Sequence, residues 1–352
     1  MGMVNFVAAL AKIALVVNAL QGAVAFMTWI ERRGSAIIQL RLGPNRVGPF
    51  GLLQPIADGV KFIFKEDVVS TVTHRPTFVL APAVAIVAAL LSFAVIPFGG
   101  TLTVAGHEIP LVIADVDAGV LLLLATSSLG VYGIIMAGWS SNNKFSQLGG
   151  LRASSQVISY ELPLGLSVIA VVVMAGTLRP IGIVEAQAQQ GLMLGALPGW
   201  YVFYNPLGFL LLLVAIFAET NRLPFDLPEA ETELVAGYHT EYSSMKFALF
   251  FMAEYIAMVT GAALLVTLYL GGYAVPAFIQ NGIGLEGNAL AIAQALVFVG
   301  KVSFFMWLFV WVRWTLPRFR FDQLMTLGWK VLIPLGLANV VWAGILAAKG
   351  WV

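Results

Sequence analysis

The sequence predicts an all-α polytopic membrane protein with about eight transmembrane helices, one interfacial amphipathic helix and an ordered acidic cytoplasmic loop. Of the 352 residues, 60% are hydrophobic and only 11% are charged, whereas soluble domains contain about 25% charged residues. The hydrophobic residues fall into segments of about 20 residues, the length that a helix needs to cross a bilayer. Cysteine is absent, which excludes disulfides and thiolate-held iron–sulfur clusters.

Eight apolar segments have this character, and we predict that residues 1–352 form a single transmembrane domain. The segments are 4–30, 77–98, 118–139, 157–178, 202–219, 247–270, 290–311 and 328–348. The first is long enough to tilt in the bilayer or to project beyond it. Since no basic region precedes it, we expect it to be retained and not removed as a signal peptide. The fifth is short and is bounded by Pro206 and Glu219.

Lysine and arginine residues predict the orientation of the chain. The loops after the first, third, fifth and seventh segments contain seven, two, two and four of the 19 Lys and Arg residues. Because basic loops remain in the cytoplasm, we place these loops there and both termini on the outer, periplasmic side.

The first cytoplasmic loop, residues 31–76, contains turn sequences followed by an amphipathic segment. Glycine and proline at 43–44 and 48–49 favour turns. In residues 52–65, apolar side chains alternate with polar ones such as Asp58 and Lys61. This pattern is too polar to cross a membrane and is typical of a helix that lies at its surface. A soluble connector helix is the alternative.

The second notable loop, residues 219–246, is acidic and directly follows an apolar run. Its carboxylates are Glu219, Asp226, Glu229, Glu231, Glu233 and Glu241, and only Arg222 and His239 oppose them. Carboxylates that adjoin a membrane span are costly and usually mark an ion or proton route. Prolines at 224 and 228 restrict the backbone, so we expect an ordered loop that forms the wall of a binding site.

Carboxylates within the spans extend this acidic group. Glu161 lies in the fourth segment and Glu254 in the sixth. Carboxylates that lie close together or away from water can hold protons near neutral pH, as a proton relay requires. The predicted relay consists of Glu161, Glu219, Arg222, Glu231, Glu233, Glu241 and Glu254, with Arg222 paired to Glu219 or Glu229. Lys12 and Lys301 also lie in predicted spans. Each could take part in the proton route or, as the alternative, form a static ion pair that fixes helix packing.

Redox chemistry requires a partner protein. The three histidines, His74, His107 and His239, all fall in predicted loops, so a buried pair of haem ligands is excluded. With no cysteine available, we predict no metal site, no redox centre and no catalytic residue in this chain. If the protein takes part in redox chemistry, the electrons must arrive from a partner protein.

Five motifs give the chain a family resemblance. They are ERR at 31–33, QLRLGPNRVGPFGLLQPIAD at 39–58, ISYELPL around Glu161, AETNRLPFDLPEAETELVAGYHTEYSSMKFALFFMAEY at 218–255 and WVRWTLPRFRFDQLMTLGWK at 311–330. Together they resemble the H-type membrane subunit of the proton-translocating NADH:quinone oxidoreductase, respiratory complex I, along essentially the whole chain. One departure is Phe321, where that family usually has tyrosine.

The resemblance implies a subunit that forms a quinone-access chamber in a bacterial cytoplasmic (inner) membrane. The chamber would open between the first span, the amphipathic helix and the sixth span. Its implied residues are Arg32, Arg41, Asp58, Phe225, Asp226 and Glu229. Quinone is the implied substrate, and the chain itself would bind no flavin, haem or iron–sulfur cluster. The implied partners are hydrophilic-arm subunits at the cytoplasmic face, small and antiporter-like membrane subunits, and lipid, with no nucleic acid.

Two other classes of function remain open from the sequence. One is the equivalent subunit of a related complex that is fed by ferredoxin, F420 or hydrogenase modules. The other is a stand-alone cation/proton antiporter or channel, which would also need carboxylates and a lysine in the membrane. The absence of an obvious inverted repeat argues against that antiporter.

Overall fold

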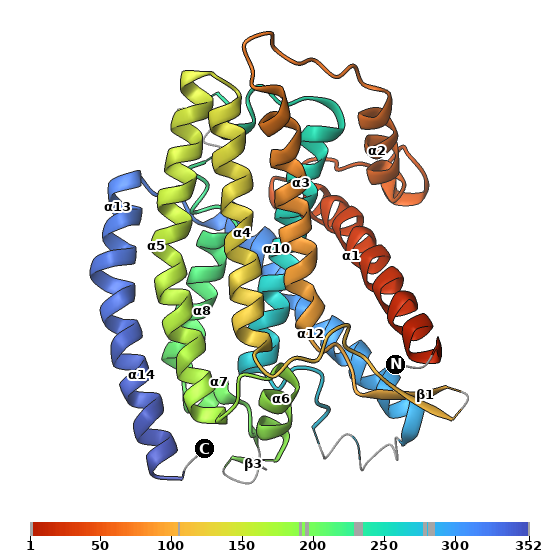
Figure 1. Ribbon diagram of the computed structural model, residues 1–352, viewed down its shortest axis with the longest axis vertical. Helices are drawn as coiled ribbons and strands as arrows, with labels where there is room; N and C mark the ends of the chain where they lie inside the picture. The colour runs from red at the N-terminus through yellow and green to blue at the C-terminus, as the bar shows by residue number, and fades with distance from the viewer. Residues whose placement is uncertain are drawn as a thin grey trace.

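The structure is a computed structural model that describes residues 3–104, 106–189, 192–193, 197–228, 235–276, 280 and 286–350. Within these residues, seven helical segments are long and apolar enough to cross a membrane, and they stand roughly side by side in Figure 1. They are α1 (Met3–Ile38), α3 (Arg75–Ser92) with the 3-10 turn η2 (Phe93–Val95), α4 (Gly119–Ser140), α5 (Lys144–Ala175), α10 (Ser244–Tyr269), α12 (Gly287–Thr315) and the continuous run of α13 (Phe321–Thr326), the π-helical turn η4 (Leu327–Leu332) and α14 (Ile333–Ala348). The predicted all-α polytopic fold is confirmed.

Shorter elements connect these helices. They are the 3-10 turns η1 (Pro49–Gly51) and η3 (Gly237–His239), the helices α2 (Gln54–Phe64), α6 (Pro180–Gln189), α7 (Tyr201–Tyr204) and α8 (Pro206–Glu219), and two antiparallel hairpins. The first hairpin pairs β1 (Thr101–Val104) with β2 (His107–Pro110), and the second pairs β3 (Leu192–Met193) with β4 (Leu197–Pro198). Strands therefore contribute only small connections outside the bundle.

The segment predicted as the fifth span differs in length from the expectation. It is divided at Asn205 into α7 and α8, because the Asn205 side chain accepts a hydrogen bond from the backbone N–H of Gly208 at 3.0 Å and so caps the start of α8. Helix α8 has 14 residues, or about 21 Å at 1.5 Å per residue. That is shorter than a bilayer core of about 30 Å, so α8 ends inside the bundle.

The chain after α8 stays within the bundle instead of leaving it at once. Buried Gln156 of α5 donates hydrogen bonds to the carbonyl oxygens of Ala218 and Phe225, both at 2.8 Å. Gly149 lets the later part of the loop approach α5, because a Cβ there would come within 2.6 Å of the Tyr238 backbone nitrogen. Residues 219–228 are therefore a packed segment and not a loop that lies wholly outside the spans.

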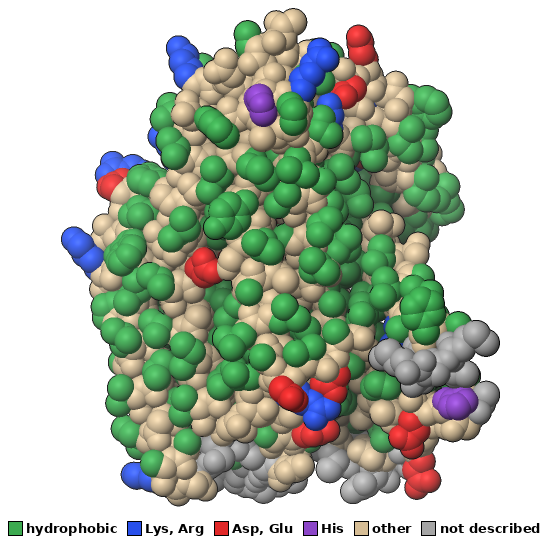
Figure 2. Space-filling model, in the orientation of Figure 1, with side chains coloured by type: hydrophobic (Ala, Val, Ile, Leu, Met, Phe, Trp, Pro, Cys, Tyr) green, Lys and Arg blue, Asp and Glu red, His purple; other side chains and the backbone are tan. Residues whose placement is uncertain are grey.

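The predicted amphipathic helix is present as α2. Its apolar residues Ile56, Val60 and Ile63 are exposed and share one helical face. Figure 1 shows α2 apart from the main bundle, near the C-terminal end of α1. In Figure 2, hydrophobic side chains are spread over the whole visible face, and Lys and Arg gather mainly towards the end that carries α2.

Arg179 is one of the basic residues at the opposite end. Arg179 forms an ion pair with Asp115, with one hydrogen bond of 2.7 Å from Nε to Oδ1. This hydrogen bond lowers the pKa of Asp115 and raises the pKa of Arg179. The charge of Arg179 on the predicted outer side is therefore balanced locally.

His239 lies in an aromatic environment beside the loop. It is buried, and its ring packs against Tyr238, Phe247 and Phe251 with centroids 5.0, 5.2 and 6.1 Å away. Burial lowers the pKa of His239 from 6.5 to about 4. The unfolded chain therefore binds more protons than the folded chain between these two values, and His239 is neutral at pH 7.

We expect this difference to destabilise the protein as the pH falls from about 6.5 towards 4. A His239→Phe variant keeps an aromatic ring but cannot be protonated. When the pH is lowered from about 7.5 to about 5, the melting temperature of both proteins in detergent solution should fall. The fall should be about 2–4 °C smaller for the variant than for the parent. His107→Phe removes an exposed histidine and is the matched control. Equal acid sensitivity of the parent and His239→Phe would contradict the assignment.

Candidate functional site

A cavity of about 570 Å³ opens between α1, α2, α10 and α12, and we call it cavity A. Three of the residues expected at a chamber, Arg32, Arg41 and Asp58, line it. The aromatic side chains of Phe62, Phe247, Phe251, Tyr255 and Trp314 form much of its wall. Cavity A thus combines an apolar wall with a few charged groups, which is typical of a site for an amphipathic small molecule.

Asp58 organises the charged side of cavity A. Its carboxylate pairs with Arg32 at 2.5 Å and lies 3.6 Å from the ammonium of Lys61, one turn along α2. Gln54 donates a longer hydrogen bond of 3.3 Å to the same carboxylate. These contacts join α1 to α2, so the geometry of cavity A depends on the Arg32–Asp58 pair.

The other residues expected at the chamber lie elsewhere. Phe225 is only 4% exposed, and its ring packs between Tyr160 and Phe319, each with a centroid separation of 5.4 Å. Asp226 pairs with Arg318 at 2.7 Å. Neither is among the residues that line cavity A in the described part of the chain. They hold the packed segment after α8 against α5 and the 316–320 connection.

A buried charge cluster around Glu31, which we call the Glu31 cluster, contributes to the lining of cavity A. Glu31 is 7% exposed and accepts a hydrogen bond from Tyr255 and ion pairs from Arg222 and Arg313. Arg222 is 9% exposed, lies 3.3 Å from Glu31 and 2.7 Å from Glu254, and its guanidinium stands 4.5 Å from the centre of the Tyr255 ring. Charges buried this deeply are tolerated only when they are paired.

This pairing changes one expectation. Arg222 joins Glu31 and Glu254 in the described structure, instead of Glu219, one of its two expected partners. The physical reason is that α8 ends within the bundle, which brings Arg222 level with Glu254, ten residues along α10. The other expected partner, Glu229, lies outside the described residues.

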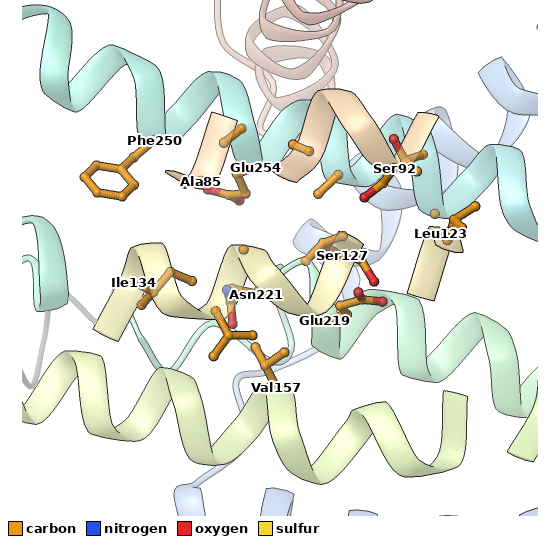
Figure 3. Close-up of a pocket in the computed structure, with 18 of the residues that line it drawn as sticks. Ala85, Ser92, Leu123, Ser127, Ile134, Val157, Glu219, Asn221, Phe250 and Glu254 are labelled. Atoms are coloured by element: carbon orange, nitrogen blue, oxygen red, sulfur yellow. The ribbon is translucent and has the colours of Figure 1, made fainter. Parts of the chain in front are cut away.

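A second, smaller cavity of about 110 Å³ lies between α3, α4, α5, α8 and α10, and we call it cavity B. Both Glu219 and Glu254 line it. Figure 3 shows the two carboxylates entering from different sides of cavity B, with Ser127 beside Glu219. Cavity B therefore brings together two carboxylates that are 35 residues apart in the sequence.

Glu161 extends this group across α4 and α5. Its carboxylate accepts a hydrogen bond from Ser128, and its charge acts on Glu219. Glu161, Glu219 and Glu254 therefore form one neighbourhood, and Arg222 connects it to Glu31 on cavity A. The structure brings these residues together from α1, α5, α8 and α10.

Among the remaining members of the predicted relay, Glu241 has a different partner. Glu241 accepts a hydrogen bond of 2.6 Å from Asn143, the residue that caps the start of α5. Glu231 and Glu233 lie outside the described residues. In the part of the chain that the structure describes, no group of three or more His, Asp or Glu side chains is arranged to hold a metal ion.

Residue-level reasoning from the sequence missed four members of the site. Glu31 and Arg313 belong to the 31–33 and 311–330 motifs. The motifs therefore marked both residues, although the sequence did not show what they contact. Tyr255 directly follows Glu254, and Ser128 directly follows Ser127, which lines cavity B. For these two, only the packing reveals the contact.

Lys12 and Lys301, which were predicted to lie within spans, bind backbone oxygens. Lys301 donates to the carbonyl oxygens of Leu270 and Gly272 at 2.7 and 2.9 Å, just beyond the end of α10. Lys12 donates to Val112 and Pro110. Both contacts fit a packing role better than a proton route, although the partners are carbonyl groups and not the carboxylates expected for ion pairs.

Comparison with known proteins agrees with the motifs. The family model described as NADH dehydrogenase matches residues 11–344. The H-type NADH-quinone oxidoreductase subunit of Cytophaga hutchinsonii is 50% identical over 319 residues, which cover 91% of this chain and 90% of that protein. NADH-quinone oxidoreductase subunit 8 of Rhodothermus marinus is 50% identical over 331 residues, with 93% of each chain covered.

A third relative extends the same agreement. The H-type NADH-quinone oxidoreductase subunit of Thermomicrobium roseum is 51% identical over 338 residues, which cover 96% of this chain and 95% of that protein. Family model and relatives thus cover nearly the whole chain, and the predicted resemblance is confirmed. The chain belongs to the NADH dehydrogenase family, as a member of its branch of H-type NADH-quinone oxidoreductase subunits.

Proposed function

We propose that this chain forms the quinone-access chamber of a proton-translocating NADH:quinone oxidoreductase and couples quinone reduction to proton movement through its carboxylates. The observation that carries the proposal is the Glu31 cluster. Arg222 contacts Glu31, which lines cavity A, and also contacts Glu254, which lines cavity B. A change of charge in cavity A therefore has a direct electrostatic connection to cavity B.

Cavity A is the proposed quinone chamber. Its aromatic wall suits the apolar ring and tail of a quinone, and the Arg32–Asp58 pair and Arg41 provide polar contacts in its lining. Phe225 and Asp226 would support the chamber from behind, as their contacts with Tyr160 and Arg318 indicate. Glu229 follows shortly after Asp226 in the sequence, and we propose that it also contributes to the chamber.

The coupling step would begin at Glu31. Reduction of a quinone consumes two electrons, supplied by a partner subunit, and two protons. A proton taken up by Glu31 would neutralise its carboxylate, weaken the Arg222–Glu31 pair and so strengthen the Arg222–Glu254 pair. Buried ion pairs respond strongly to such changes, because an unpaired charge in the interior is costly.

Protons would then move between the carboxylates of cavity B. Glu254 and Glu219 share that cavity, and Glu161 lies beyond Glu219 with Ser128 as its hydrogen-bond donor. A cavity of about 110 Å³ has room for about three water molecules, which could bridge polar groups that do not touch. Glu231 and Glu233 would extend the acidic group at the cytoplasmic end, with Glu241 placed near the start of α5.

The proposed function also implies partner subunits and an orientation in the membrane. Hydrophilic-arm subunits would bind at the end that carries α2, where Lys and Arg gather in Figure 2. Small and antiporter-like membrane subunits would receive protons from Glu161. Both termini would face the outer side of a bacterial inner membrane, since the basic loops define the cytoplasmic side.

Removing the relay carboxylates tests the proton route. Glu254→Gln and Glu161→Gln, each in the assembled complex in sealed vesicles, should reduce proton translocation and donor:quinone turnover about tenfold, because an amide cannot take up and release a proton. The measurements are the pH change across the vesicle membrane and the oxidation rate of the donor. Glu185→Gln, an exposed residue of α6, is the matched control. Full turnover and translocation in both relay variants would rule out the route.

Removing the Asp58 pair tests the chamber. Arg32→Ala and Asp58→Asn should raise the KM for a short-chain quinone about five- to tenfold, because the loss of one charged hydrogen bond is worth about 1–1.5 kcal/mol. Initial rates at varied quinone concentration give the KM. Arg320→Ala removes an exposed Arg–Asp pair outside cavity A and should leave the KM unchanged. Parental kinetics in both chamber variants of an intact complex would count against cavity A.

A further inference from the structure

Helix α1 contacts the bundle through one stripe of side chains. From Phe6 onward, where side chains are described, its buried apolar residues up to Met27 are Val16, Leu20, Val24 and Met27. They are spaced by four, four and three residues and therefore share one face of the helix. The opposite face is exposed, and Figure 1 shows α1 leaning away from the other helices. Packing along its length fixes the position of α1 only weakly.

Both ends of this stripe carry a charge. Lys12 precedes Val16 by four residues, and Glu31 follows Met27 by four. At the inner end, Glu31 binds Arg222 and Arg313. At the outer end, the ammonium of Lys12 donates hydrogen bonds to the carbonyl oxygens of Val112 at 2.8 Å and Pro110 at 3.4 Å. The position of α1 thus depends on polar contacts at its two ends.

The segment that receives Lys12 is itself attached to α12. Asn288, in the first turn of α12, exchanges two hydrogen bonds with the backbone of Thr103 in β1, at 2.7 and 2.8 Å. Gln294, about two turns further, accepts a hydrogen bond of 3.0 Å from the backbone N–H of Gly100. A Cβ at Gly100 would lie 2.4 Å from the Gln294 side-chain oxygen, so glycine permits this approach. Figure 1 shows the N-terminus, β1 and the start of α12 together at the lower right.

We propose that Lys12, the β1–β2 hairpin and Asn288 form an outer anchor that sets the separation of α1 and α12 and so the width of cavity A. Both helices line cavity A, α1 along its second half from Gln21 to Ser35 and α12 near its C-terminal end with Arg313 and Trp314. With the outer end fixed, a change in the Glu31 cluster turns the inner end of α1 about the anchor instead of moving the whole helix. Lys12 and Asn288 are then positioning residues, and their relevance to quinone rests on the proposed function.

The width of cavity A can be measured without quinone. The chain contains no cysteine, so Val24→Cys introduces a single thiol on the cavity-facing stripe. In the assembled complex, alkylation of this thiol by N-ethylmaleimide is followed by mass spectrometry of this chain. Adding Lys12→Met, which removes both hydrogen bonds but keeps an apolar side chain of similar length, should raise the alkylation rate about threefold or more, as local opening becomes easier.

Asn288→Ala provides a second route to the same result, because it removes only the two hydrogen bonds between the hairpin and α12. It should also raise the alkylation rate, and it remains informative if Lys12→Met prevents assembly. Lys330→Met, an exposed lysine of η4 on the far side of the bundle, is the matched control and should leave the rate unchanged. Parental alkylation rates in both anchor variants would overturn the anchor.

Quinone kinetics separate this inference from the proposed function. If cavity A binds quinone, both anchor variants should raise the KM for a long-chain quinone while kcat stays near the parental value, since the anchor touches neither quinone nor the carboxylates. Faster alkylation with an unchanged KM would support the anchor and contradict cavity A as the quinone chamber. An unchanged alkylation rate with a raised KM would be compatible with cavity A as the quinone chamber and would contradict the proposed anchor.

Discussion

The structure depends on the burial of Arg222 between two carboxylates. A guanidinium that is 9% exposed within a membrane bundle is stable only beside compensating charge. Glu31 of α1 and Glu254 of α10 supply that charge, and Tyr255 places its ring against the guanidinium. Three segments far apart in the sequence must therefore meet at one point, and the two cavities are adjacent because they meet there.

This constraint explains why α8 is short. If α8 continued across the membrane, Arg222 would be carried out to the surface and could not reach Glu254. The chain instead ends its helix at Glu219, and Gln156 binds the carbonyl oxygens of Ala218, in the last turn of α8, and of Phe225, beyond that helix. Irregular backbone at this depth is tolerated where protein groups satisfy its hydrogen bonds. The same interruption places Glu219 in cavity B.

Both ends of α1 follow a related principle. An apolar helix in lipid gains little from packing against other apolar helices, because lipid is equally apolar. Polar contacts therefore determine where it stands. The Glu31 cluster fixes the inner end, and backbone carbonyls of the hairpin receive Lys12 at the outer end. In α12, Arg313 and Asn288 take part in the corresponding contacts, so α1 and α12 act as a pair around cavity A.

The sequence by itself determined the fold class, seven of the eight spans, the amphipathic helix α2 and the family, because hydrophobic length and linear motifs are properties of the chain alone. It also identified Arg32, Arg41 and Asp58, which the structure places together, and Glu161, Glu219 and Glu254, which it places near one another. Only the tertiary structure decided that Arg222 pairs with Glu31, that Phe225 is packed away from cavity A, and that Lys12 binds the hairpin. Each of these contacts joins residues separated by about 90 positions or more, except Phe225 with Tyr160 at 65. Pairings at such separations depend on where helices end and how deeply they pack, which no local pattern in the sequence specifies.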